Sequence, residues 1–97
     1  SLDDAGQISA IHRSQAVIAF DLDGTILDAN DNFLAVVKYR RDEIVGKHHS
    51  MFVPPEERDR PAYQAFWAAL RRGEFQAAEY RRIGKEGREV WIRATYN

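Results

Sequence analysis

The stretch Phe20-Asp-Leu-Asp-Gly-Thr-Ile-Leu-Asp-Ala-Asn30 decides the fold, because two incompatible structures can be built around it. In one, the aspartates follow a buried strand and carry out chemistry at its carboxyl end. In the other, the same aspartates lie in a tight turn between two antiparallel strands, and the chain then enters a helix. The first structure is an enzyme and the second is a binding module, so the rest of the sequence has to distinguish them.

Taken alone, Asp21-Leu-Asp-Gly-Thr25 after an apolar run resembles the first motif of the haloacid-dehalogenase-type phosphatases. That resemblance implies that Asp21 is the nucleophile and Asp23 the general acid/base. Phosphoryl transfer also needs a downstream acidic pair that holds magnesium, and charged groups that position the phosphate. No Asp-Asp or Gly-Asp-x-x-x-Asp motif follows Asp23, and 97 residues are too few for the further strands and helices. The phosphatase is kept only as an alternative.

The hairpin interpretation accounts for the whole stretch. Residues 17–20 form a short apolar strand, residues 21–24 have the aspartate and glycine that a turn prefers, and residues 25–27 form the returning strand. Asp28 or Asn30 then provides the N-cap of a helix. The inward face of that helix carries Phe33, Leu34 and Val37.

The remainder of the chain predicts short helices followed by a long hairpin. Residues 41–45 have the length of a helical turn that ends at Gly46, and residues 48–53 form another that Pro54-Pro55 stops. The clearest helix covers residues 61–72. One of its faces carries Tyr63, Phe66, Trp67 and Leu70.

Two strands over residues 75–83 and 88–96 flank the loop Gly84-Lys-Glu-Gly87. The charge runs 40–43 and 81–88 are expected to be solvated surface. Because strands, helices and strands follow one another without βα alternation, the order indicates an α+β fold.

Composition excludes several classes of function. Fourteen basic and fifteen acidic residues give a net charge of -1, without the basic excess that nucleic-acid binding requires. Cysteine is absent, which removes disulfides, thiolate metal sites, cysteine nucleophiles and flavin–cysteinyl photochemistry. No apolar run approaches the length of a membrane span. We therefore expect one cytoplasmic domain with no direct membrane span.

In their order and spacing, several segments resemble a PAS domain over about residues 15–97. They are Phe20-Asp-Leu-Asp-Gly24, Asp28-Ala-Asn30 with Phe33, Tyr39-Arg-Arg-Asp-Glu-Ile-Val-Gly46, and Gly84-Lys-Glu-Gly87 before Trp91. The match is narrowed to one group of PAS domains by two further segments, Gly46-Lys-His-His-Ser-Met-Phe52 and Leu70-Arg-Arg-Gly-Glu74. The chain is similar to PAS domains of bacterial chemotaxis and aerotaxis transducers and of related sensor histidine kinases.

The resemblance implies an antiparallel five-stranded sheet with short helices on one face. The last strand would be missing here, so that residues 16–97 form a C-terminally truncated PAS domain. Residues 1–15 would form an N-terminal flanking helix, which in this family packs on the outer face of the sheet and joins a dimer. We therefore expect self-association through that helix and the sheet, and a downstream signalling domain in the same chain.

The similarity to flavin-binding aerotaxis receptors points to Trp67, Asn30 and His49 as cofactor-binding residues. The core face of its helix would by itself account for Trp67, and a helix N-cap would by itself account for Asn30. His49 matches the Gly-x-x-His segment of those receptors, and a neutral imidazole can bind a ligand or haem iron. Adjacent residues on a helix point in different directions, so at most one of His48 and His49 faces a pocket.

The identity of the ligand stays open. FAD is possible, haem is the weaker candidate, and an interior without a cofactor, in a module that only binds proteins, is the alternative. The flavin-binding receptors have basic residues where this chain reads Val53-Pro-Pro-Glu-Glu57, and its acidic groups do not attract a pyrophosphate. Neither they nor the histidines have the spacing of a metal site. No catalytic residue is expected, and output would be a shift between two packings of the flanking helix.

Overall fold

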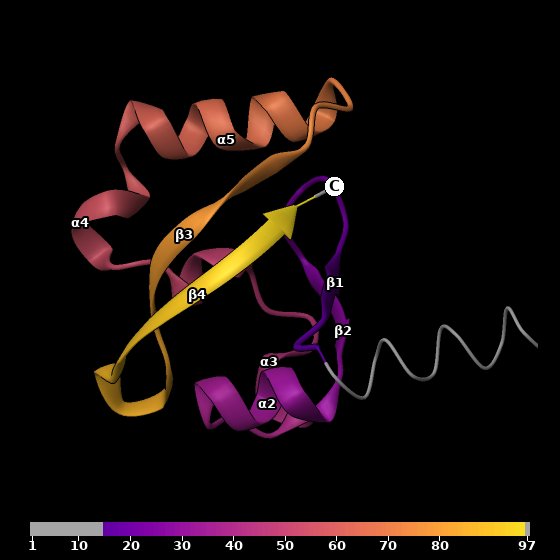
Figure 1. Cartoon of the computed structure of the whole chain (residues 1–97), viewed down its shortest axis with the longest axis vertical. Coiled ribbons are helices and arrows are strands. Elements are labelled where there is room, and N and C mark those ends of the chain that lie inside the picture. Colours follow the sequence, from indigo (N-terminus) through magenta and orange to yellow (C-terminus); the bar gives the residue numbers. More distant parts are fainter. Residues whose placement is uncertain (1–14, 97) are drawn as a thin grey trace, which may run out of the picture.

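The computed structural model describes residues 15–96, which form two antiparallel hairpins and a set of short helices (Figure 1). The elements are β1 (Ile18–Phe20), β2 (Ile26–Ala29), α2 (Asp31–Val37), α3 (Arg41–Ile44), η1 (His49–Phe52), α4 (Pro55–Arg58), α5 (Pro61–Arg71), β3 (Gln76–Ile83), η2 (Lys85–Gly87) and β4 (Glu89–Tyr96). This order confirms the α+β expectation. The predicted N-terminal flanking helix lies outside the described residues, apart from Gln15.

β1 and β2 form the hairpin predicted from the opening stretch. The carboxylate of Asp21 accepts hydrogen bonds from the backbone N–H groups of Asp23 at 2.9 Å and Thr25 at 3.0 Å, and Gly24 has a φ of +87°. The side chain proposed as a phosphatase nucleophile therefore shapes a turn. β1 pairs antiparallel with β2, whereas the phosphatase alternative needs a doubly wound parallel sheet, so the fold of that alternative is not the one formed here.

The helices predicted over residues 41–45, 48–53 and 61–72 form within one residue of those bounds, and one further helix was not predicted. Asn30 is the N-cap of α2, and Gly46 follows α3 with a φ of +85°. The unpredicted helix involves the pair Pro54-Pro55, which was expected only to stop a helix. Pro55 instead begins α4, because a proline at the first helical position gives up no helical hydrogen bond.

A hydrophobic core lies between the first hairpin and the short helices. Ile26, Val37, Ile44 and Phe52 are each at most 2% exposed and come from β2, α2, α3 and η1. The rings of Phe33 and Phe52 meet edge to face, with centroids 5.4 Å apart. Burial of these side chains stabilises the arrangement of the four elements, at roughly 1.5–3 kcal/mol for each large side chain.

β3 and β4 pair in an unbroken register along their whole length. Tyr80 lies opposite Ile92 and Arg82 opposite Val90. Because side chains alternate along a strand, these four share one face of the hairpin. That face is the inner one, since the Tyr80 ring contacts Phe66 of α5 with centroids 6.1 Å apart.

The second hairpin is held at its turn by the short helices near the first hairpin (Figure 1). Lys85 Nζ lies 2.7 Å from Glu43 Oε2 of α3. Gly84 lies so close to α2 that a Cβ atom placed on it would be 2.7 Å from the Val37 carbonyl oxygen. The glycine at this turn is therefore needed for close packing against a helix end.

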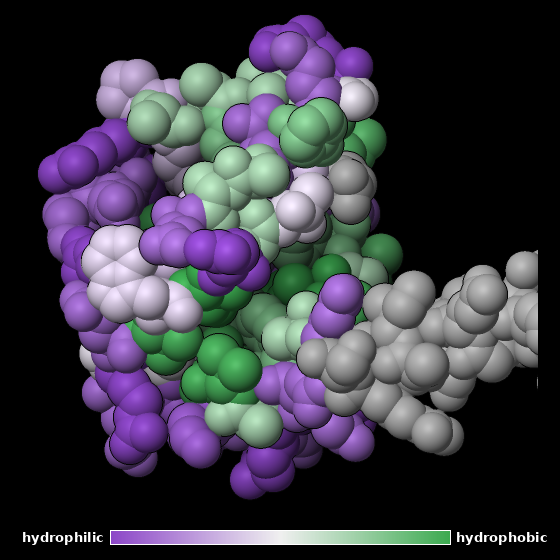
Figure 2. All heavy atoms as spheres, in the orientation of Figure 1, coloured by the Kyte–Doolittle hydropathy of each residue, from purple (hydrophilic) through white to green (hydrophobic). Residues whose placement is uncertain are grey.

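Among the described residues, the two hairpins are separate two-stranded sheets, which differs from the single sheet that the resemblance implies. Between them lies a groove of about 810 Å³, bordered by residues 15–20, Phe33 and residues 92–96. Figure 2 shows hydrophobic surface in the hollow between β4 and the first hairpin. This hairpin groove has one strand edge on each side, because neither β1 nor β4 has a second ladder partner.

Candidate functional site

His49 of η1 lies at the junction of the helices and the second hairpin and is 2% exposed. Its Nδ1 is 2.9 Å from the hydroxyl of Tyr63 in α5, and its Nε2 is 3.2 Å from the hydroxyl of Tyr96 in β4. Aromatic rings surround the imidazole on all these elements. We call this group of side chains the His49 cluster. Its members are His49, Phe20, Phe52, Tyr63, Phe66, Trp67 and Tyr96.

The buried imidazole is kept neutral. Burial, together with the positive charge of Arg82 and the neighbouring His48, lowers the pKa of His49 from 6.5 to about 3. Burial also raises the pKa of the Tyr63 hydroxyl. The cluster therefore presents uncharged hydrogen-bonding groups within aromatic walls. His48 is exposed, as expected if only one of the two histidines faces inward.

Trp67 belongs to the same cluster, so the structure brings together two of the three predicted cofactor-binding residues. It is 5% exposed and makes edge-to-face contacts with Phe20, His49, Tyr63 and Phe66, at centroid distances between 5.4 and 6.3 Å. Its indole N–H makes no hydrogen bond of normal geometry, although it lies close enough to the Tyr63 hydroxyl to lower the pKa of that group against the larger effect of burial. Trp67 is thus a packed core residue.

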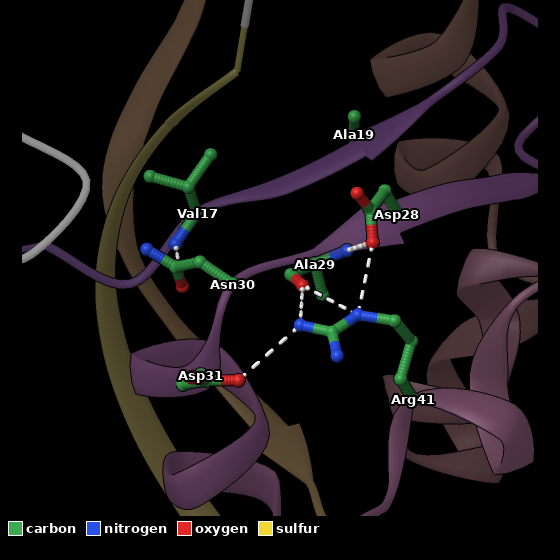
Figure 3. Close-up of a pocket in the computed structure, with 7 residues that line it drawn as sticks. All are labelled: Val17, Ala19, Asp28, Ala29, Asn30, Asp31 and Arg41. Atoms are coloured by element: carbon green, nitrogen blue, oxygen red, sulfur yellow. Dashed lines mark hydrogen bonds and ion pairs between the residues drawn. The ribbon is translucent and has the colours of Figure 1, made fainter. Parts of the chain in front are cut away.

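Asn30 lies apart from this cluster, at the end of β2. Its Oδ1 accepts hydrogen bonds from the backbone N–H of Val17 at 2.9 Å and of Phe33 at 3.0 Å, and its Nδ2 donates to the Gln15 carbonyl at 2.6 Å. Figure 3 shows the side chain beside Val17. Asn30 therefore ties the start of β1 to α2, and a cofactor contact would have to replace one of these bonds.

The cleft beside Asn30 has a volume of about 370 Å³ and is dominated by Arg41. The guanidinium binds Asp28 at 3.1 Å, the Ala29 carbonyl at 2.8 Å and Asp31 at 3.3 Å (Figure 3). These partners lie on β2 and at the start of α2. Arg41 therefore fastens α3 to the first hairpin, and its charge is already neutralised.

Sequence reasoning missed Arg82, because the charge run 81–88 was expected to be solvated. Arg82 is 7% exposed, so this expectation was wrong for it. Its guanidinium lies over the Tyr80 ring, 4.6 Å from the centroid, and its Nη2 donates to the Tyr96 hydroxyl at 3.4 Å. The signal that could have found it is strand alternation, which places Arg82 on the same inward face as Tyr80.

The side chains of this interior are of the kinds that recognise a ligand. They combine aromatic walls with phenol hydroxyls, a neutral imidazole and a guanidinium. Residues 15–96 contain no group of three His, Cys, Asp or Glu side chains placed to hold a metal ion. Within the same residues, no helix has the length and apolar character needed to cross a membrane.

The sequence of this chain is similar to a protein family and to parts of two longer bacterial proteins. Residues 26–97 match the family model described as the PAS fold. The chain is 45% identical over 91 residues to the biofilm dispersion protein BdlA of Pseudomonas aeruginosa, covering 94% of this chain and 22% of BdlA. It is 32% identical over 74 residues to the aerotaxis receptor of Escherichia coli, covering 76% of this chain and 14% of the receptor. The chain thus spans less than a quarter of either relative.

Solved structures of low sequence identity have the same fold. The PAS domain of a protein from Colwellia psychrerythraea has a TM-score of 0.77 at 20% identity, covering 94% of this chain and 78% of that one. A light-oxygen-voltage domain studied with a flavin analogue has a TM-score of 0.67 at 21% identity, covering 94% of this chain and 70% of that one. These structures share the fold alone. With the family match over residues 26–97, they show that this chain belongs to the PAS fold family.

Proposed function

We propose that this chain is the sensory module of a bacterial chemotaxis transducer or sensor kinase, and that its interior binds a small ligand. The observation that carries the proposal is the His49 cluster, where η1, α5 and β4 meet at one buried polar side chain. A ligand there can change how the helices pack on the hairpin, which is the kind of change that such modules transmit. The relatives' names, a biofilm dispersion protein and an aerotaxis receptor, support a role in signalling.

The remaining parts of the proposal follow from the same observations. The relatives are far longer than this chain, so we propose that an output domain belongs to the same protein. The cytoplasmic location expected from the sequence is part of the same proposal. We also propose that the module performs no catalysis of its own, because Asp21 is committed to its turn. An assay for magnesium-dependent phosphatase activity tests this point.

The His49 cluster as it stands fits neither flavin nor haem. Trp67 has aromatic neighbours in edge contact, which leaves no parallel slot for an isoalloxazine ring. Both nitrogens of His49 bond to tyrosine hydroxyls, so iron ligation would break one of these bonds. Glu56 and Glu57 follow η1, and Glu56 pairs with Arg81, so this segment provides no basic group for the pyrophosphate of a flavin dinucleotide. We therefore favour a colourless ligand.

The first prediction concerns the absorption spectrum of the purified protein. We expect neither flavin bands nor a haem Soret band, and we expect small molecules to raise the melting temperature in a ligand screen, as ligands of the folded state do. A flavin or haem spectrum would contradict the colourless ligand and send Trp67, Asn30 and His49 to mutagenesis. If no compound raised the melting temperature and mass spectrometry found no bound molecule, the ligand-binding function would be lost.

A second role, self-association, is supported by the exposed outer face of the second hairpin. Trp91 of β4 is 65% exposed there, opposite Arg81 in the register. We expect Trp91→Ser to weaken a homodimer by at least about tenfold, because the residues that dominate interfaces cost about 2 kcal/mol or more when truncated and tryptophan is enriched among them. Sedimentation equilibrium measures this. The control is Leu27→Ser, which removes an exposed apolar side chain from the other hairpin. A protein that is monomeric throughout, or a dimer unaffected by Trp91→Ser, would rule out this surface.

A further inference from the structure

Arg82 is a buried cation that has no anionic partner in the part of the chain described. It is 7% exposed, it forms none of the ion pairs of residues 15–96, and its Nε makes no hydrogen bond. Its other contacts are to neutral groups, from Nη1 to the Arg81 carbonyl at 3.2 Å and from Nη2 to the Tyr96 hydroxyl at 3.4 Å. Arginine is almost never fully buried unless it is paired, since an uncompensated buried charge is costly.

The neighbourhood of Arg82 does not provide the missing charge. On the inner face it meets the rings of Tyr80 and Tyr96, with its guanidinium carbon 4.6 and 6.0 Å from their centroids. The acidic side chains that form ion pairs near this hairpin do so with other bases. Glu56, Glu57 and Glu89 lie against Arg81, and Glu79 pairs with Arg93. The positive charge of Arg82 is therefore left directed at the interior.

We propose that Arg82 is the anion-binding residue of the interior site, and that the ligand is a small organic anion with a carboxylate or phosphate group. This inference rests on the proposed ligand-binding function and names the chemical class of the ligand. A guanidinium holds either anion with two parallel N–H bonds, and the unbonded Nε is part of that planar fork. The adjacent tyrosine rings suit the organic part of the ligand.

The structure also indicates the route to Arg82. Tyr96 lines the hairpin groove and its hydroxyl bonds both to Arg82 and to His49. The phenol thus stands between the groove and the guanidinium. An anion that enters through the groove replaces the long 3.4 Å contact to Tyr96 with charge-assisted bonds, which are the stronger kind.

The test uses Trp67 as a reporter, because Trp67 and Trp91 are the two tryptophans of the chain. In a Trp91→Phe background, the fluorescence of Trp67 is titrated with benzoate, benzamide and inorganic phosphate at constant ionic strength. We expect saturable binding of benzoate or phosphate, with benzamide at least about tenfold weaker because it lacks the charge. Benzoate binding alone identifies a carboxylate ligand, and phosphate binding alone a phosphorylated one.

The matched variants are Arg82→Met and Arg88→Gln, which remove one positive charge each, from the interior and from the exposed turn end of the same hairpin, away from the groove. We expect Arg82→Met to lose at least about tenfold in anion affinity and Arg88→Gln to lose none. Should Arg82→Met fail to fold, Arg82→Lys keeps the charge, loses the fork, and is expected to weaken binding as well. Equal binding of benzoate and benzamide would overturn the anion site while leaving a ligand site in place. Absence of anion binding, or its persistence in the Arg82 variants, would also overturn the inference.

Discussion

Replacing Gly84 by alanine is expected to destabilise the fold by roughly 3 kcal/mol, the upper end of the range for overpacking a tight contact. The added Cβ would lie 2.7 Å from the Val37 carbonyl oxygen and 3.2 Å from its carbon, so both neighbours are backbone atoms of α2. A side chain could move aside, but a buried helix end cannot do so without shifting the core around Val37, which is 0% exposed. Urea unfolding of the wild type and the variant measures the difference.

The matched control for this prediction is Gly87→Ala in the same turn. A Cβ at Gly87 meets nothing within 4 Å, but the residue has a φ of +75°, so only backbone strain of about 1 kcal/mol is added. At Gly84 the φ is -94°, which any residue can adopt. Similar losses of stability in the two variants would show that the turn, and not its contact with α2, sets the requirement for Gly84.

The wild type is expected to lose about 2 kcal/mol of stability between about pH 7.5 and pH 5 through His49 alone. The pKa of His49 is lowered from 6.5 to about 3 in the folded state by burial, Arg82 and His48. The unfolded chain therefore binds a proton below about pH 6.5 that the folded chain refuses until about pH 3. The protein therefore loses stability as the pH falls through that window, and the contribution of His49 is fully present above it. Urea unfolding at a series of pH values measures the slope.

His49→Gln is expected to flatten this slope, because glutamine can bond to tyrosine hydroxyls but does not titrate. His48→Gln removes the exposed neighbouring imidazole. In this variant the loss of stability due to His49 is expected to remain. The pKa of Glu43 is lowered by the backbone N–H of Arg40 and then by Lys85, and that of Glu56 by its own backbone N–H and then by Arg81, so both stay ionised in this window. Identical pH slopes for the wild type and His49→Gln would contradict the neutral buried imidazole.

Much of the fold could be predicted because its turns, caps and helix faces follow local sequence preferences that the rest of the chain does not override. The turn at Asp21 and Gly24, the cap at Asn30 and the inward face of α5 each depend on residues adjacent along the chain. Pro54-Pro55 was the exception, since a proline pair is compatible both with the end of one helix and with the start of the next. The gap between the two hairpins also could not be predicted, because strand patterns show which face is buried but not which strands become neighbours.

The candidate site was harder to predict than the fold, for a physical reason. His49 and Trp67 were identified through the family resemblance, and the structure places their rings 5.5 Å apart. Their role in binding a cofactor stays a prediction, as does that of Asn30. Arg82 was hidden because a run of charged residues normally indicates solvent, and only the inward position of Tyr80 two residues earlier shows that one charge of the run is buried.

The hydrogen bonds of His49 have a consequence for how the module could carry a signal. A neutral imidazole has one N–H and one lone pair, so the hydroxyls of Tyr63 and Tyr96 must be oriented in opposite senses, one donating and the other accepting. Whichever tautomer the imidazole takes, the donor role of one tyrosine hydroxyl assigns the acceptor role to the other. The second hairpin and α5 are in this way linked by the direction of a short hydrogen-bonded chain, in which the role of Tyr96 fixes that of Tyr63.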